Sequence, residues 1–217
     1  MIKKLCLSVL LMTTSIYCEI SFSQTQTDIK TEIANTYYEV ASKLPKVNPQ
    51  VLRLAVTAYC NAHSEGYDNK EILTIVDYSM PSNKKRLWVF DIKNDKVLYS
   101  TYVAHGSGSG YLYANRFSNE TNSHQSSLGL FETEQTYSGH VGYALRLQGL
   151  DAGYNDHALS RAIVVHGAEY ADPEFIDKYG RLGRSQGCFA LPENDFHGVI
   201  DTIQDHTLIF AYYPQQE

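Results

Sequence analysis

The sequence predicts a mainly β fold, a β-sandwich with an N-terminal helical cap and one C-terminal helix. After residue 67, short runs of β-branched and aromatic residues alternate with turn signals, which is typical of sandwiches rather than of alternating β-α-β units. Before residue 67, apolar residues recur at helical spacing, and another such stretch lies near the C-terminus. With 217 residues, 43% of them hydrophobic, the chain can bury a core of ordinary size.

Two helices are expected before the strands. Apolar side chains recur every three or four residues between positions 28 and 44, and Pro45 ends this run. Asn48, which is followed by a proline, is typical of a helix N-cap, and Gly66 would end the second helix. Cys60 belongs to the apolar stripe of this helix, so we expect it to be a small core residue rather than a reactive one.

The strands expected after the helices are short. Residues 93–96 separate two strand-like runs and predict a hairpin. The expected strands cover residues 73–78, 87–90, 97–99, 128–132, 144–147, 162–166 and 207–213. One amphipathic helix is expected between residues 193 and 204. The polar segments 106–110 and 118–127 predict long loops, and such loops in a compact domain are often functional.

The first residues are typical of an export signal. Lys3 and Lys4 precede an apolar stretch that is too short to span a bilayer well, and small residues at positions 21 and 23 predict cleavage after Ser23. An uncleaved anchor is the alternative. The expected organisation is therefore a signal peptide (1–23), a helical segment (24–66) and a main domain (67–217). We expect the mature protein in the periplasm or cell envelope, with no stable membrane span.

Charge and histidine spacing exclude several function classes. The formal net charge is −6 at pH 7 and no basic stripe is present, which argues against nucleic-acid binding. His105, His124, His140 and His157 form neither an H-E-x-x-H motif nor a tight His/Cys cluster, so no metal and no other cofactor is expected. His105 and His124 lie in segments that are candidates to line a groove. The sequence leaves the oligomeric state open.

A histidine and a cysteine are the candidates for chemistry. His166 ends an apolar run and is followed by Gly167, whose carbonyl is placed to orient the imidazole ring. Cys188 follows Gly187, which permits a sharp turn and a close approach of substrate. The N–H groups of these two residues are candidates for an oxyanion hole. Because an ordinary thiol is mostly protonated at neutral pH, Cys188 needs a base, and His166 is our candidate.

Structural roles for His166 and Cys188, in place of catalytic ones, also agree with the sequence. His166 can be a buried structural histidine, and Cys188 can be an inert core thiol. Two cysteines remain after signal cleavage, so a disulfide between Cys60 and Cys188 is a further alternative in an oxidising compartment.

The motifs resemble those of the murein L,D-transpeptidase catalytic-domain family, in the YkuD-like superfamily. The resemblance begins with the His166–Gly167 pair and the later serine-x-glycine-cysteine run at 185–188. It extends to the segments Arg86–Asp91, Thr101–Gly106, Ser126–Gly129, Leu145–Leu150 and Arg161–Val164, and it covers residues 70 to 213. These parts occur in the family's order, which makes the resemblance specific.

The resemblance implies an L,D-transpeptidase-like β-sandwich at residues 67–217 that acts on peptidoglycan stem peptides. It implies that Cys188 attacks the bond before a terminal D-alanine, with His166 as base, Gly167 as the orienting carbonyl and Ser185 as a support of the turn. An amine or water then takes the acyl group, so the expected activity is that of an L,D-transpeptidase, an L,D-carboxypeptidase or both.

Two positions depart from the family pattern. Many members have histidine where this chain has Gln186, and arginine where it has Ala190. An amide does not titrate, and arginine is suited to bind a substrate carboxylate, so Arg184 or Arg181 is a candidate replacement. The full set of candidate substrate contacts is Arg184, Gln186, Tyr154, Arg161 and His105. Asp156 is more simply a solvated charge.

Two other functions remain possible from the sequence. A sortase-like transpeptidase also places histidine before cysteine, but that class needs an arginine after the cysteine and none follows Cys188. A non-catalytic protein that binds the cell wall is the second alternative, because the changes at Gln186 and Ala190 would fit a loss of catalysis.

Overall fold

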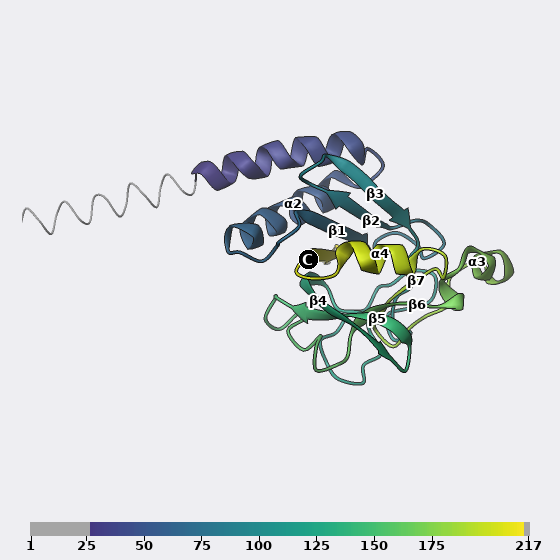
Figure 1. Ribbon diagram of the computed structural model, residues 1–217. Coiled ribbons are helices and arrows are strands. Elements are labelled where there is room, and N and C mark those ends of the chain that lie inside the picture. Colours follow the sequence, from purple (N-terminus) through teal and green to yellow (C-terminus); the bar gives the residue numbers. More distant parts are fainter. Residues whose placement is uncertain (1–26, 215–217) are drawn as a thin grey trace, which may run out of the picture.

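The computed structural model describes residues 27–214, and its strands form one curled sheet (Figure 1). The strand order is β3-β2-β1-β8-β4-β5-β6-β7. The strands are β1 (Ile72–Asp77), β2 (Leu87–Asp91), β3 (Lys96–Thr101), β4 (Gly129–Gly139), β5 (Gly142–Gly149), β6 (Val164–Gly167), β7 (Phe189–Leu191) and β8 (Leu208–Tyr212). The predicted mainly β class is confirmed. The predicted signal peptide lies outside the described residues.

The two edges of this sheet meet, which makes the fold barrel-like. The pairs β1–β8 and β6–β7 are parallel, and the remaining pairs are antiparallel. Beyond β3, Ala104 forms a bridge to Ala190 of β7, so the first edge strand continues toward the last one. The two layers expected of a sandwich are therefore parts of one sheet that encloses an apolar core together with α4 (Phe196–Ile203).

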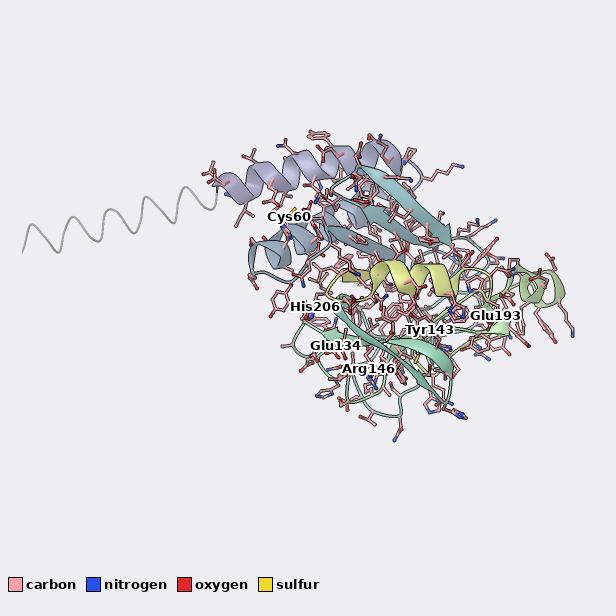
Figure 2. All side chains as sticks on the ribbon, viewed as in Figure 1. Cys60, Glu134, Tyr143, Arg146, Glu193 and His206 are labelled. Carbon is pink, nitrogen blue, oxygen red and sulfur yellow. The ribbon has the colours of Figure 1, made fainter. Side chains whose placement is uncertain are left out.

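The N-terminal helices cover the outer face of β1, β2 and β8, as predicted. Residues 27–43 are helical, and α2 spans Pro49–Ser64 with Asn48 as its N-cap, whose side chain accepts a hydrogen bond from the Gln50 N–H at 2.9 Å. Apolar residues of both helices pack against the outward side chains of these strands. Cys60 is fully buried in this second core, as expected, and Figure 2 shows it at the helical cap.

Three parts of the fold differ from the expectation, and one of them is the short strand β7, which was not among the expected strands. The β4–β5 hairpin is much longer than the two short runs that were predicted, because its outer half is polar and exposed. A short 3₁₀ helix (Glu169–Ala171) and α3 (Pro173–Tyr179) follow β6 and were not predicted, since α3 has no buried side chain and so lacks an apolar stripe. In the described part of the chain, no helix has both the length and the apolar character needed to cross a membrane.

The N-cap of α2 gives a testable prediction. Asn48→Ala removes the hydrogen bond to the Gln50 N–H, and we expect it to lower the free energy of unfolding by about 1 kcal/mol in urea titration. Asn61→Ala is the matched control, because Asn61 is exposed in the same helix and its side chain caps nothing. Equal losses for both variants would contradict the capping role.

Candidate active site

His166 is held in one orientation at the end of β6. Its Nδ1 lies 2.8 Å from the carbonyl oxygen of Gly167. Because a carbonyl oxygen only accepts hydrogen bonds, Nδ1 carries the proton and Nε2 is left as an acceptor. Burial lowers the pKa of His166, although the Gly167 carbonyl and the carboxylate of Glu193 oppose this shift. The ring is therefore a neutral imidazole at neutral pH, which is the form a base requires.

Strand register places Cys188 on the same face as His166. In the parallel pair β6–β7, His166 is the register partner of Ala190. Cys188 lies two residues before Ala190, and alternate residues of an extended chain share a face. Both His166 and Cys188 line one pocket with a volume of about 630 Å³. The structure thus brings the two candidates for chemistry together.

The turn before Cys188 is fixed by Ser185 and requires a glycine. The Ser185 hydroxyl donates to the Cys188 carbonyl at 2.7 Å and accepts from the Gly187 N–H at 3.1 Å. Gly187 has a φ of +122°, and a Cβ there would lie 2.8 Å from the Gln125 carbonyl oxygen. The expectation that the Gly187 N–H belongs to an oxyanion hole is wrong, because Ser185 already accepts from it. The N–H of Cys188 lies beside the thiol of its own residue and helps to lower the pKa of that thiol.

The surroundings of Cys188 favour the protonated thiol over the thiolate. Burial raises its pKa, while the Val164 N–H and the Arg161 guanidinium act in the opposite direction. The thiol donates to the carbonyl oxygen of Ala162 at 3.6 Å. Ala162 has a φ of +54°, a left-handed conformation that non-glycine residues rarely adopt and that clusters at functional sites.

Arg161 anchors the loop at residues 118–127 to the wall of the pocket, and its guanidinium places a positive charge beside the Cys188 thiol. Its guanidinium donates to the Ser118 carbonyl at 2.7 Å and the Gln125 carbonyl at 2.7 Å, and to the hydroxyls of Ser127 at 2.6 Å and Ser123 at 3.2 Å. A Cβ on Gly187 would lie 3.4 Å from its Nη2, which places the cation next to the nucleophile turn. The sequence suggested a substrate contact here. Arg161 does line the pocket of Cys188, and these hydrogen bonds tie its guanidinium to its own chain.

His105 does not reach the pocket, which corrects its assignment as a substrate contact. The residue is fully buried, and its Nδ1 lies 2.8 Å from Nη2 of the equally buried Arg86. Burial and the adjacent guanidinium lower the pKa of His105 to about 3. The reason is that the chain continues in extended form beyond β3, where the His105 carbonyl accepts from the Ser185 N–H at 3.0 Å. His105 therefore supports the turn from behind.

The remaining predicted contacts divide into two groups. Gln186 and Arg184 line the pocket of Cys188. Tyr154 does not, since its ring lines a different pocket with Leu54 of α2 and is 55% exposed there. Asp156 is also outside the pocket and binds the Asn119 side chain at 2.7 Å.

Sequence reasoning missed Tyr170. This residue lines the same pocket as Cys188, and the charges of the two side chains interact. Burial, and to a smaller extent the repulsion between a tyrosinate and an ionised Cys188, raise the pKa of Tyr170 to about 12. The chain has 17 tyrosines, and nothing in the sequence around Tyr170 indicates that this one lies in the pocket. His124 and His140 also line this pocket.

The structure contains neither a disulfide nor a cluster of metal ligands among its described residues. Cys60 and Cys188 are both free thiols, so the alternative of a disulfide between them is not present in the structure. Residues 27–214 contain no group of three or more His, Cys, Asp or Glu side chains that could hold a metal ion.

Comparison with known proteins gives one family match and several similar solved structures. The family model described as L,D-transpeptidase catalytic domain matches residues 43–212. An L,D-transpeptidase from Mycobacterium smegmatis is 15% identical with a TM-score of 0.41, over 66% of this chain and 59% of that chain. The helical cell shape determining protein Pgp2 from Campylobacter jejuni is 15% identical with a TM-score of 0.47, over 69% of this chain and 49% of that chain. The chain thus spans less than two thirds of either structure, and no curated protein matches the sequence.

The position of Arg161 predicts the reactivity of Cys188. Arg161→Gln removes a cation that stabilises the thiolate, so we expect alkylation by iodoacetamide at pH 8 to slow by about threefold or more and its pH profile to move to higher pH. The measurement is made in a Cys60→Ala background, so that Cys188 is the thiol that reports. Arg161→Lys keeps the charge but not the fork of hydrogen bonds. If Lys slows alkylation as much as Gln does, the effect is loop structure and the electrostatic role is refuted.

Proposed function

Because the chain belongs to the L,D-transpeptidase catalytic domain family, we propose that it is a cysteine-dependent acyltransferase that acts on peptidoglycan stem peptides. The family match confirms the resemblance and the fold expected from the motifs. The observation that carries the proposal is the parallel pair β6–β7, which presents the His166 imidazole and the Cys188 thiol on one face of one pocket.

In the first half of the proposed reaction, the enzyme is acylated. Nε2 of His166 takes the proton of the Cys188 thiol as Sγ attacks the carbonyl carbon of the third stem residue. The N–H of Cys188 donates to the oxygen that becomes negative. The C–N bond to the terminal D-alanine then breaks, His166 returns the proton to the leaving amine, and a thioester remains on Cys188.

In the second half, the thioester is resolved. An amine of another stem or a water molecule attacks the thioester carbonyl, with Nε2 of His166 accepting its proton. The C–S bond breaks and the thiolate is reprotonated from His166. Transfer to an amine is transpeptidation, and transfer to water is carboxypeptidation. We propose that the protein performs one or both on stem peptides that end in D-alanine.

The chain's organisation is part of the proposal. Residues 67–217 would form the catalytic domain and residues 24–66 its helical cap, whose α2 packs on the outer face of the sheet. The predicted signal at residues 1–23 would send the protein to the periplasm or cell envelope, where its substrate is found.

A non-catalytic role in binding the cell wall is the second candidate. It is favoured by Gln186, an exposed amide at the pocket where many family members have a titratable imidazole. Acylation of Cys188 separates the two candidates, because a binding protein would retain the peptide without forming a thioester.

The nucleophile is tested by intact-mass spectrometry with a synthetic tetrapeptide stem. We expect wild-type protein to gain the acyl mass or to release terminal D-alanine, and Cys188→Ala to do neither, with activity reduced at least about 1000-fold. Cys60→Ala is the matched control, since its thiol is buried in the helical cap, and it should behave as wild type. Turnover by Cys188→Ala, or none by folded wild type, would reject the acyl-enzyme.

The base is tested by the pH dependence of kcat/KM. Burial disfavours the charged imidazolium and lowers the pKa of His166 below its ordinary value of 6.5, so the neutral base persists to lower pH and activity should fall only below about pH 6.5. Glu193→Gln removes a carboxylate that raises this pKa and should move the acid limb to still lower pH. An acid limb that lies above pH 6.5, or that survives in His166→Gln, would exclude this imidazole as the base.

A further inference from the structure

Arg184 stands where three pockets meet. It lines the pocket of Cys188, a larger neighbouring pocket of about 820 Å³, and a small one of about 280 Å³. The larger pocket is formed by Ser107, Gly110, Tyr111, Asn115, Arg116, Arg184 and Tyr213. None of the three is lined by an aspartate or a glutamate. In a chain with 24 acidic and 18 basic residues, the absence of carboxylates among the residues that line these pockets leaves the region around Arg184 locally positive.

The cations of this region lack protein counterions. The guanidinium carbons of Arg181 and Arg184 lie 4.5 Å and 4.3 Å from the centroid of the Tyr111 ring. Arg116 is exposed on the wall of the larger pocket. Within residues 27–214, no carboxylate lies within ion-pair distance of any of these three arginines. Like charges gathered without a counterion repel one another, and a bound anion relieves that repulsion.

Arg184 is also oriented in advance. Its Nη1 donates to the carbonyls of Gly110 at 3.2 Å and Ser107 at 3.4 Å, while its face rests on Tyr111. The other edge of the guanidinium has no partner among the described residues. A planar guanidinium with one edge anchored and one edge open is suited to bind a carboxylate through two parallel hydrogen bonds.

We propose that the pocket formed around Arg184 and Arg116 is a subsite for a carboxylate of an acidic substrate peptide, separate from the bond that Cys188 attacks. This inference rests on the proposed function for the identity of the peptide, because stem peptides carry carboxylates besides the one on the D-alanine that leaves. Arg184 connects this subsite to the pocket of Cys188 and so aligns the peptide across both. Arg184 would also take the role of the arginine that many family members have at the position of Ala190.

Direct binding tests the subsite without turnover. In a Cys188→Ala background, the probes are a synthetic stem tetrapeptide with free carboxylates and the same peptide in which every carboxylate except that of the terminal D-alanine is converted to a carboxamide. Binding is measured by calorimetry. We expect Arg184→Gln to weaken binding of the carboxylate peptide by about tenfold, and Arg116→Gln to weaken it by a smaller factor. Binding of the carboxamide peptide should change by less than about twofold.

Controls separate a subsite from a general effect. Arg53→Gln is matched in kind, because Arg53 also stacks on a tyrosine, at 5.2 Å from the Tyr37 ring, but it lies on α2 away from these pockets. It should bind both peptides as the Cys188→Ala parent does, and Arg184→Lys should recover part of the lost affinity.

Equal losses for both peptides, no loss in Arg184→Gln, or no binding by the parent would overturn the inference. The acyl-enzyme experiment with intact Cys188 judges the proposed function separately. If that experiment fails while Arg184 still discriminates carboxylate from carboxamide, the subsite stands and only the catalysis is lost.

Discussion

The hydrogen bond between His166 Nδ1 and the Gly167 carbonyl is the constraint on which the rest of the site depends. It fixes the tautomer, turns Nε2 toward the pocket, and ties the ring to the backbone of its own strand. A ring free to rotate would offer an N–H as readily as a lone pair, and an N–H does not accept a proton from a thiol. The parallel register of β6 and β7 then sets where Cys188 stands relative to this lone pair.

The residues around Cys188 hold its thiol in place and provide a cation from a position other than the one in the family pattern. Ser185 closes the turn from below, and Arg161 binds the long loop to the pocket wall. Gln186 cannot titrate and Ala190 is buried, so Arg161 is the cation that offsets part of the cost of forming a thiolate at the half-buried Cys188. The loop lies on the wall beside the thiol, so the folding of that loop and the reactivity of Cys188 are coupled.

Most of the local structure and the two candidate residues that share the pocket, His166 and Cys188, could be predicted from the sequence, because their signals are local. Asn48 before a proline and the His166–Gly167 pair are read within a few residues. The errors at His105, Gly187 and Tyr154 arose because each depends on contacts distant in the chain: burial against Arg86, a serine that takes the N–H, and a loop that turns to another pocket. No sequence pattern distinguishes Tyr111 and Arg116, because only the fold brings them into one pocket with Arg184.

The central claim is that neutral His166 presents an unprotonated Nε2 to the Cys188 thiol, and the NMR tautomer of this ring tests it most directly. Long-range ¹H–¹⁵N correlation spectra at pH 7, with His166→Gln for assignment, should show Nδ1 protonated and Nε2 bare. A ring protonated at Nε2, or an imidazolium at that pH, would contradict the account, because such a ring has no lone pair with which to take the proton of the thiol.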